Sequence, residues 1–399
     1  MESKKEIMRK RFIYLDYAAS TPQDAKVQKV MLPFFAREFG NPSSVHQLGQ
    51  RAKAAVEGAR EQVAKFLSCF ANEVVFTAGA TEANNIAIQG VIKQSSFTKP
   101  HVITCVIEHE SLLAPIEALE KKGVIEATYI KVGKEGVVNL KDIEKSLQKN
   151  TILVSIQYAN SEIGTIQPIA EIGKMLRKYK KEDAKRQVVF HSDAVQAALY
   201  LDCNVEKLGV DLLTLSSHKI YGPKGAGVLY IRKGSAIEPL FLGGGQEQDM
   251  RPGTENVAGI VGMGEAIGEI QNPKTKVQNI RIRQLRDMFI KIIQQRISTA
   301  EVTGSLLKRL PNNVHIRFKG VEGKDVVLLL DQKGIAISAG SACSERSQEP
   351  SHVLLSMGYT KTEASCAVRI TLGKHTKKEE VEKTVKVLEK VIEQLRIKK

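Results

Sequence analysis

The 399-residue chain has no tryptophan and few cysteines, and the cysteines that it has are scattered. They stand at Cys69, Cys105, Cys203, Cys343 and Cys366. An odd number without a CxxC pair or a Cys/His cluster argues against a disulfide framework and against a zinc site. Such a set fits a reducing compartment, so we expect a cytoplasmic protein.

The chain also lacks an apolar run long enough to span a bilayer. The first eleven residues, MESKKEIMRKR, are charged and no apolar stretch follows them, which argues against a secretory signal. Acidic residues within this segment, and a strand-like run from Phe12, argue against a transit peptide. We therefore expect no contact with a membrane.

Acidic residues are fewer than basic ones, 44 against 59, which gives a formal net charge of +15. Such an excess can attract nucleic acid, anionic substrates or acidic proteins. It can also be a solvated, lysine-rich surface. The lysines are spread along the chain without an aromatic-interleaved basic stripe. This pattern favours the solvated surface, and we expect no direct binding of nucleic acid.

Short apolar runs rich in β-branched residues alternate with amphipathic helical stretches. This alternation predicts an α/β fold with a mostly parallel sheet that helices cover on both faces. The expected strands are Val74–Thr77, Val102–Ile107, Ile152–Gln157, Val188–Ser192, Leu212–Ser216 and Gly227–Ile231. The expected helices include Gly49–Ser68 and Val277–Arg296.

The alternation weakens after about Glu265, and this change predicts two domains. We expect a large domain over 14–265 and a smaller C-terminal α+β domain over 266–399, with which the N-terminal residues could pack. Thr376 and Glu379 form a capping-box pattern ahead of the last helix.

Polar or ionisable residues follow several expected strands. His109, Asn160, Asp193 and Lys219 each stand at such a position. Ligands of parallel sheets bind beyond the carboxyl ends of the strands, so we expect these side chains near one crevice. Each residue taken alone also has an ordinary explanation: a satisfied histidine, a turn asparagine, a helix-capping aspartate and a surface lysine.

Together these residue types suit an aromatic aldehyde cofactor. A lysine in a crevice can form an imine with an aldehyde, and an imidazole can stack on a ring. A buried aspartate needs a partner such as a pyridinium N–H. Gln196 lies on the same side as Asp193 if the chain turns helical there. The segment Thr77–Gly90 predicts a helix start, and such a start suits a phosphate.

Cys343 differs from the other cysteines in its surroundings. It stands in SAGSACSERSQEP, among small residues that give way to polar and charged ones. Cys69, Cys105 and Cys203 lie in or beside apolar stretches and are expected to be packing residues. A cysteine on an exposed loop suits a nucleophile that must travel.

The motifs as a set resemble the cysteine desulfurases, a NifS/IscS-type, class V aminotransferase-like group of pyridoxal-phosphate enzymes of fold type I. The motifs are YLDYAASTP, NPSSVH, FTAGATEANN, EHES, NSEIGTIQP, SDAVQ, SSHKIYGPKG, GGGQEQDMRPGTEN and SAGSACSERSQEPSHVL. The resemblance covers about Tyr14 to Gly373. It implies a homodimeric enzyme that takes sulfur from L-cysteine, leaves L-alanine and passes a Cys343 persulfide to an acceptor or iron–sulfur scaffold protein.

The resemblance also implies a role for each matching residue. Lys219 would hold pyridoxal 5'-phosphate as a Schiff base, Asp193 would pair with the ring nitrogen, and His109 would stack on the ring. Gln196 and Asn160 would contact the ring. The phosphate would be held by Ala80, Thr81, Ser216 and His218, with Thr254 from the neighbouring subunit. Asn41 and Arg369 would bind the substrate carboxylate.

Fold does not fix the reaction, so other pyridoxal-phosphate chemistries stay open. An aminotransferase or a selenocysteine lyase would share the cofactor site, but neither requires a nucleophilic cysteine. A binding protein that has lost catalysis would not be expected to retain Lys219, Asp193, His109 and Cys343 together. The resemblance leaves open whether Cys343 also ligates an iron–sulfur cluster transiently, and no other metal ligand is expected.

Overall fold

The computed structural model describes residues 12–183, 186–340 and 350–397. Within these residues a seven-stranded sheet forms the centre of the larger part of the molecule. Its strands, in spatial order, are β2 (Val74–Thr77), β8 (Gly227–Ile231), β7 (Leu212–Ser216), β6 (Val189–Asp193), β5 (Thr151–Ser155), β3 (His101–Cys105) and β4 (Glu126–Ile130). Strand β8 pairs antiparallel with both of its neighbours, and the other described pairs are parallel.

The large sheet has an apolar core on each face, because successive side chains of a strand point to opposite faces. Val102 and Leu153 pack on one face with the helices α5 (Ala80–Gln94) and α6 (Glu110–Lys121). Their neighbours Ile103 and Val154 pack on the other face. The helices that contribute to this second core include α2 (Ala25–Met31), α4 (Gln47–Leu67), α7 (Leu140–Ser146), α8 (Ile169–Glu182), α9 (Val205–Leu208) and α10 (Val257–Gln271), and residues of α13 (His352–Ser356) and α14 (Lys361–Ser365) join it. The sheet is therefore buried on both sides, as its apolar strands predict.

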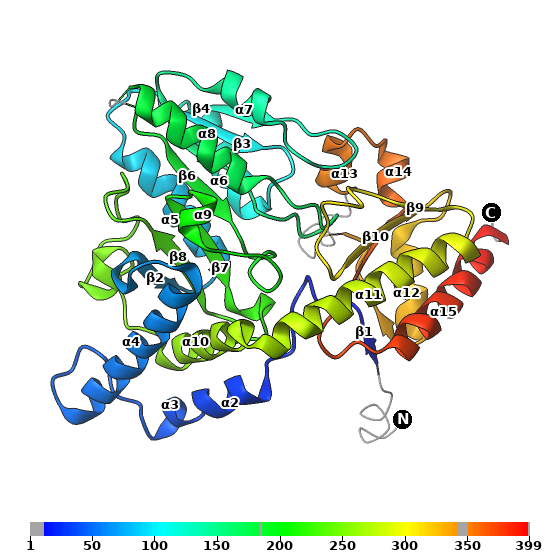
Figure 1. The fold of residues 1–399 in the computed structure, drawn as a ribbon, viewed down its shortest axis with the longest axis horizontal. Coiled ribbons are helices and arrows are strands. Elements are labelled where there is room, and N and C mark those ends of the chain that lie inside the picture. Colours follow the sequence, from blue (N-terminus) through cyan, green and yellow to red (C-terminus); the bar gives the residue numbers. More distant parts are fainter. Residues whose placement is uncertain (1–11, 184–185, 341–349, 398–399) are drawn as a thin grey trace.

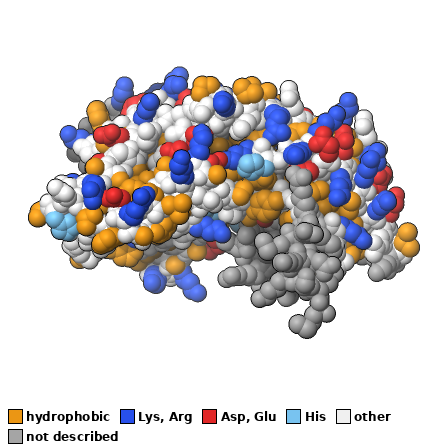
Figure 2. Space-filling view, turned by 90° about the horizontal axis from the view of Figure 1, so that it is seen from below, with side chains coloured by type: hydrophobic (Ala, Val, Ile, Leu, Met, Phe, Trp, Pro, Cys, Tyr) orange, Lys and Arg blue, Asp and Glu red, His pale blue; other side chains and the backbone are white. Residues whose placement is uncertain are grey.

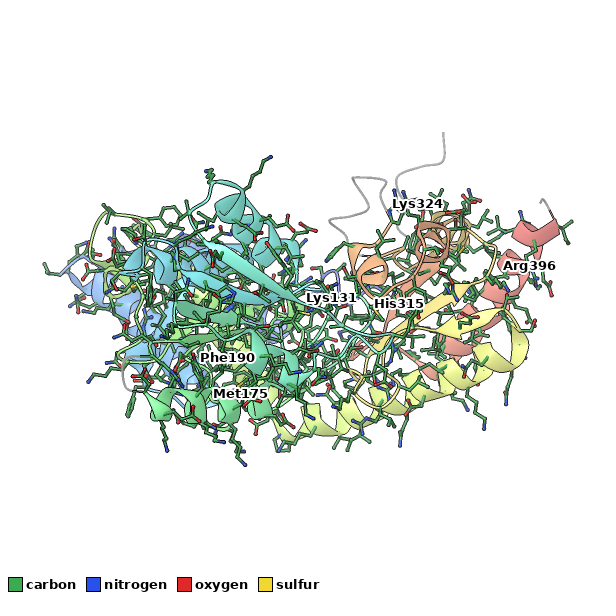
Figure 3. The ribbon with its side chains drawn as sticks, turned by 90° about the horizontal axis from the view of Figure 1, so that it is seen from above. Lys131, Met175, Phe190, His315, Lys324 and Arg396 are labelled. Atoms are coloured by element: carbon green, nitrogen blue, oxygen red, sulfur yellow. The ribbon has the colours of Figure 1, made fainter. Side chains whose placement is uncertain are left out.

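A second, smaller unit lies beside the large one (Figure 1). Its antiparallel sheet has the order β12 (Ala367–Thr371), β10 (Asn313–Phe318) and β9 (Ala300–Val302) among the described residues. Its helices are α11 (Pro273–Arg296), α12 (Gly323–Gln332), α13 (His352–Ser356), α14 (Lys361–Ser365) and α15 (Lys378–Ile397). Among the residues labelled in Figure 3, Phe190 lies in the large sheet and His315 lies on β10 of the small unit.

The N-terminal strand belongs to the small unit by its contacts. Strand β1 (Ile13–Tyr14) pairs in parallel with β11 (Ile335–Ala336), and Ile13 pairs with Ile335. Leu15 is buried in the core of the small unit. The first described residues therefore belong to the small unit, and the chain then crosses to the large one.

The predicted domain boundary at 265/266 lies inside α10. Ala266 and Ile267 on this helix pack in a core of the large sheet. Asn272 separates α10 from α11, the long helix that runs from the large unit to the small one (Figure 1). We propose that the large domain ends at this asparagine.

The predicted elements agree with the structure in type and differ at their ends. The strands at β2, β7 and β8 have the predicted bounds, while α4 begins at Gln47 and α11 at Pro273. Strand β4 at the edge of the sheet was not predicted. No helix among the described residues is long and apolar enough to cross a membrane.

The predicted capping box at Thr376 and Glu379 is wrong by one residue. The Glu380 carboxylate accepts the backbone N–H of Lys377 at 2.9 Å, directly before α15 begins. The Thr376 hydroxyl instead accepts the N–H of Gly373 at 2.9 Å. The threonine therefore closes the preceding turn, and the glutamate one position further on satisfies the helix start.

Candidate active site

A cavity of about 1080 Å³ opens where β2, β6 and β7 of the large sheet end. Asp193 is the last residue of β6, and Ser216 is the last residue of β7. The small unit contributes Arg369 from β12. Of the predicted site residues, this cavity brings together Ala80, Thr81, His109, Asp193, Gln196, Ser216, His218, Lys219 and Arg369. It lies at the carboxyl ends of parallel strands, where ligands of such sheets bind.

Lys219 ends a short 3-10 turn, Ser217–Lys219, that follows β7 directly. Its Nζ donates to the carbonyl oxygens of Ala18 at 2.6 Å and Ala19 at 2.8 Å. The N-terminal segment thus passes over the lysine and fixes where the amine lies. A tight reversal follows, with Tyr221 at a φ of 67°, and it keeps the short turn separate from β8.

Asp193 is buried at the floor of the cavity. Its Oδ1 accepts the backbone N–H of Val195 at 2.9 Å, and its Oδ2 accepts Nδ2 of Asn84 at 2.9 Å. A carboxylate oxygen can accept more than one hydrogen bond. Asp193 therefore retains the capacity to accept a further N–H from a ligand in the cavity.

His109 is the N-cap residue of α6, and its ring nitrogen Nδ1 accepts the N–H of Ser111 at 3.1 Å. The Ser111 hydroxyl lies 2.8 Å from the same nitrogen. Burial lowers the pKa of His109 below its ordinary value, and the Lys219 charge lowers this pKa further while Asp193 opposes the shift. The imidazole is therefore neutral at pH 7.

Helix α5 points its N-terminus at the cavity. Gly79 is its N-cap, and no side chain hydrogen-bonds the first turn from that position. A Cβ added at Gly79 would meet no atom within 4 Å, so the space in front of the helix is open. Ala80 and Thr81 line the cavity from the first turn. Free N–H groups and the positive end of the helix dipole make this a suitable site for a phosphate.

His218 lines the cavity together with Lys219 and Lys224. Its Nδ1 is 3.3 Å from the Ser20 hydroxyl. Burial lowers the pKa of His218 to about 4, and the charges of Lys219 and Lys224 act in the same direction. At pH 7 this imidazole is a neutral hydrogen-bonding group, and Lys224, which also lines the cavity, supplies positive charge.

Arg369 reaches the cavity from the small unit and is 2 % exposed. Its Nη2 donates to Oδ1 of Asp16 at 2.8 Å, and its Nη1 donates to the carbonyl oxygen of Ser161 at 3.3 Å. Its Nε has no hydrogen-bond partner among the described residues. A buried guanidinium with an unused donor is suited to receive a carboxylate.

Three predicted site residues lie outside this cavity. Asn160 is buried, and its side chain bonds backbone groups: Nδ2 donates to Ile107 O at 3.0 Å, and Oδ1 accepts the N–H of Glu162 at 2.9 Å. Asn41 and Thr254 are exposed. The ring, carboxylate and phosphate contacts of these residues stay predictions. Cys343 lies outside the described residues.

The loop that carries Thr254 has an unusual backbone. Glu247, Gln248 and Asp249 follow one another with φ values of 48°, 57° and 66°, a region that non-glycine residues seldom occupy. The Glu247 carboxylate is buried against Arg60, with oxygen–nitrogen distances of 2.8 and 3.0 Å. It also accepts the N–H of Phe76 at 2.7 Å. The loop is thus fastened to the edge of the large sheet.

The sequence analysis missed Asn84 and Ser111. Asn84 lies on α5 with no exposed surface, and its Nδ2 bonds both Asp193 and the Ser111 hydroxyl, the latter at 2.8 Å. The signal available was an asparagine on the apolar side of a helix, beside Ala83 and Ala87. Such a residue must find polar partners when it is buried.

The cavity therefore combines groups with distinct abilities. It holds an amine at Lys219, a carboxylate at Asp193, a neutral imidazole at His109, an open helix N-terminus and a buried guanidinium. This set can bind a phosphorylated, protonated heteroaromatic ring and an amino acid carboxylate in one place. The amine can both form an imine and transfer a proton.

Comparison with known proteins gives consistent matches over nearly the whole chain. The family model described as aminotransferase class-V matches residues 13–384. The cysteine desulfurase IscS of Dictyoglomus turgidum is 48 % identical over 387 residues, which cover 97 % of this chain and 96 % of that protein.

Two solved structures have the same fold. One, described as a NifS-like protein, superposes with a TM-score of 0.89 at 35 % identity and covers 96 % of this chain and 100 % of its own. Another, described as SspA in complex with cysteine, has a TM-score of 0.79 at 34 % identity and covers 92 % of this chain and 100 % of its own.

Proposed function

We propose that this chain, which belongs to the class V aminotransferase family and is a cysteine desulfurase, holds pyridoxal 5'-phosphate at Lys219 and transfers the sulfur of L-cysteine to Cys343. Enzymes of this family depend on pyridoxal phosphate. One observation carries the proposal: Lys219, Asp193 and His109 line a single cavity into which an uncapped helix N-terminus points.

The residues of the cavity fit the cofactor by their chemistry. Asp193 can accept the ring N–H, Gln196 can reach the ring hydroxyl, and the neutral His109 can lie against the ring. The open space before Gly79 suits the phosphate, with donors from the first turn of α5 and from Ser216 and His218. When bound, the cofactor supplies an electron sink for charge that develops on the substrate.

Lys219 is the residue that we assign to proton transfer. Its Nζ lies against the carbonyl oxygens of Ala18 and Ala19, so the amine has a fixed place near the cavity floor. As a free amine, Lys219 would be positioned to take the Cα proton of cysteine.

Arg369 is the residue that we assign to the substrate carboxylate. Its guanidinium is buried and oriented by Asp16 and the carbonyl oxygen of Ser161. Two parallel N–H donors match the geometry of a carboxylate. Asp16 therefore orients the guanidinium while leaving its other donors for the substrate.

The sulfur transfer itself is assigned to Cys343. The Cβ–S bond of cysteine breaks, a sulfur–sulfur bond forms at Cys343, and the carbon skeleton takes up a proton and leaves as alanine. Three of the other cysteines are unsuited to this attack, because burial raises the pKa of Cys69 to about 12 and raises those of Cys105 and Cys203 further. The segment before Cys343 is anchored near the site, since Ser338 exchanges backbone hydrogen bonds with Arg369.

A second copy of the chain is the partner that we propose for a set of exposed apolar side chains in the segment 32–45 and at Leu242. Leu32, Phe35, Phe39 and Val45 are each at least 66 % exposed, and Leu242 is 84 % exposed. Figure 2, which views the molecule from below, shows hydrophobic side chains at the surface among scattered basic ones. Burial of such a surface in a homodimer would be favourable, and the resemblance implies that Thr254 of one subunit would then reach the phosphate site of the other.

The persulfide is passed on, in this proposal, to a sulfur acceptor or iron–sulfur scaffold protein in the cytoplasm. A relative is named cysteine desulfurase IscS, and the resemblance to NifS/IscS-type enzymes implies a role in iron–sulfur cluster assembly. The four described cysteines are free thiols, which fits a reducing compartment. Cys343 could serve there as a transient cluster ligand, since its thiolate would be the last group to hold the sulfur.

The proposal is tested with two variants of the purified protein. Lys219→Ala should abolish the visible absorption band that covalently bound cofactor gives, and it should abolish alanine formation. Cys343→Ala should keep that band and release no sulfide from cysteine. Cys69→Ala is the matched control and should release sulfide at the wild-type rate. Full sulfide release by Cys343→Ala, or a retained band in Lys219→Ala, would refute the assignment.

A further inference from the structure

Asn84 occupies the centre of a polar network below the cavity. It has no exposed surface, and its Nδ2 lies 2.9 Å from Oδ2 of Asp193 and 2.8 Å from Oγ of Ser111. Its Oδ1 is buried without a hydrogen-bond partner among the described residues. Burying the Asn84 Oδ1 without a partner costs free energy, and the two hydrogen bonds that its Nδ2 donates offset that cost.

Asp193 decides which way the Asn84 amide faces. The opposite orientation of the amide would place its oxygen against a carboxylate oxygen, and two acceptors would repel each other. The amide nitrogen therefore faces Asp193 and uses one proton there. The second proton of the same nitrogen points to Ser111.

The Ser111 hydroxyl links Asn84 to His109. Its oxygen accepts from Asn84, so its own proton is available for Nδ1 of His109, 2.8 Å away. The backbone N–H of Ser111 donates to the same ring nitrogen. Two donors aimed at Nδ1 leave no room for a proton on it, so the imidazole carries its proton on Nε2.

We propose that Asn84 and Ser111 are positioning residues that hold His109 as the neutral Nε2–H tautomer by tying its ring to the carboxylate of Asp193. This use of the network in catalysis rests on the proposed function, whereas the tautomer itself does not. The cofactor would then have the Asp193 carboxylate at its ring nitrogen and the His109 imidazole, in one protonation state, against its face. The Asn84 amide would orient both groups.

The network also explains why protonation of His109 is disfavoured. Burial and the charges of Lys219 and His352 oppose the imidazolium. Asp193 and Glu110 favour it, and the net direction is a lowered pKa of His109. In addition, a proton on Nδ1 would face the backbone N–H of Ser111, which cannot accept it, and the Ser111 hydroxyl would have to turn its own proton away. Without Asn84, the Ser111 hydroxyl could turn and accept a proton from Nδ1. We therefore expect loss of Asn84 to raise the pKa of His109 by about one unit, a tenfold change in the protonation equilibrium.

The test measures the two ring nitrogens of His109 by NMR in protein labelled with 15N-histidine, with and without pyridoxal phosphate. Wild type should show a bare Nδ1 and a protonated Nε2. Asn84→Leu and Ser111→Ala keep the backbone N–H of Ser111 on Nδ1 but weaken or remove the hydroxyl donor, so each should increase the population with a proton on Nδ1 and raise the pKa of His109. Ser111→Thr keeps the hydroxyl and should restore the wild-type signals.

Ser155→Ala is the matched control. It removes a buried hydroxyl 2.9 Å from Nδ1 of another histidine, His191, so it should change the signals of His191 and leave those of His109 unchanged. Should Asn84→Leu fail to fold, Ser111→Ala and Ser111→Thr decide alone. A proton on Nδ1 in wild type, or an unchanged His109 in Ser111→Ala, would overturn the inference.

Activity separates this inference from the proposed function. In Asn84→Leu and Ser111→Ala, the acid limb of the pH profile of kcat/KM for cysteine should move upward by as much as the His109 pKa. An acid limb that stays in place despite a moved pKa would overturn the catalytic use of the network. Absence of cysteine turnover in wild type would refute the proposed function and leave the NMR result intact.

Discussion

Replacing Glu247 by alanine should open the loop that carries Thr254 without unfolding the rest of the protein. Glu247 binds Arg60 through both carboxylate oxygens and accepts the N–H of Phe76. Removing one partner of a buried ion pair typically costs about 3–5 kcal/mol. Each non-glycine residue in the left-handed region costs roughly 1–2 kcal/mol, and the loop has three in succession.

The cost of removing the Glu247 carboxylate and the backbone strain of the three left-handed residues are of similar size, so the loop should open when the carboxylate is removed. The strain of about 3–6 kcal/mol in the loop is offset mainly by the ion pair and its hydrogen bonds. Without the carboxylate, the strained conformation loses its main support, whereas the sheet behind it keeps its own hydrogen bonds and apolar core. We therefore expect local opening and not global unfolding.

Hydrogen–deuterium exchange read by mass spectrometry measures this opening. A loss of about 3 kcal/mol corresponds to roughly a hundredfold faster exchange in peptides that span 243–256. Peptides from α15 should exchange as in wild type. Glu247→Gln keeps the size and one acceptor, and should give an intermediate rate.

Glu57→Ala is the matched control, because it removes the other carboxylate near Arg60. That contact is 3.3 Å long and the Glu57 side chain is 49 % exposed, so its loss should cost under about 1 kcal/mol. Equal exchange in the Glu57 and Glu247 variants, or unchanged exchange in Glu247→Ala, would refute the reasoning. Gln248→Gly should slow exchange of the loop, because glycine tolerates a positive φ.

Three further predictions concern acid stability, substrate and cofactor. Burial lowers the pKa of His191 to about 3, so the unfolded chain takes up a proton near pH 6.5 while the folded protein does not. The stability from this group is complete above that pH and is lost as the pH falls towards 3, by about 2 kcal/mol between pH 6.5 and 5. Urea unfolding should show this slope, and His191→Gln should flatten it; an equal slope in both would contradict the assignment. Arg369→Lys should raise the KM for cysteine at least about tenfold, because a point charge replaces a planar fork. The cofactor band should not change, and an unaltered KM would remove Arg369 from the substrate site. Asp193→Asn should weaken pyridoxal-phosphate affinity by roughly 10- to 100-fold, since a charge-assisted hydrogen bond is lost. Absorbance titration measures this, and unchanged affinity would show that the ring nitrogen pairs elsewhere.

Most of the large domain could be predicted from sequence, because its strands are continuous apolar runs buried on both faces. Val74–Thr77 and Leu212–Ser216 are examples whose bounds agree with the structure. Strand β4 was missed for the opposite reason. It lies at the edge of the sheet, and most of its residues are partly exposed, so its pattern is less apolar.

The cavity was predicted in outline because strand ends carry its main groups. Asp193, Ser216 and Lys219 were placed by the rule for parallel sheets. Asn84 could not be placed in this way, since its role depends on Ser111 and Asp193, which are 27 and 109 residues away in sequence. Hydrogen bonds between distant segments require the tertiary fold, and no local pattern encodes them.

The capping error at α15 has a similar cause. Thr376 and Glu379 match the spacing of a capping box, but Glu380 matches it equally well from Lys377. Which residue caps the helix depends on Gly373, because its N–H donates to the Thr376 hydroxyl. Local competition for one hydroxyl thus shifts a helix start by one residue.

The pairing of β1 with β11 has a consequence for the order in which the protein is made. Ile13 leaves the ribosome early, but its partner Ile335 follows more than three hundred residues later. Ala18 and Ala19, which hold Lys219, belong to the same early segment, and the N–H of Ala18 donates to the Thr371 hydroxyl on β12. The large sheet can therefore form during synthesis while the N-terminal segment is still unpaired. An enzyme that liberates reactive sulfur would become active only after its chain is nearly complete.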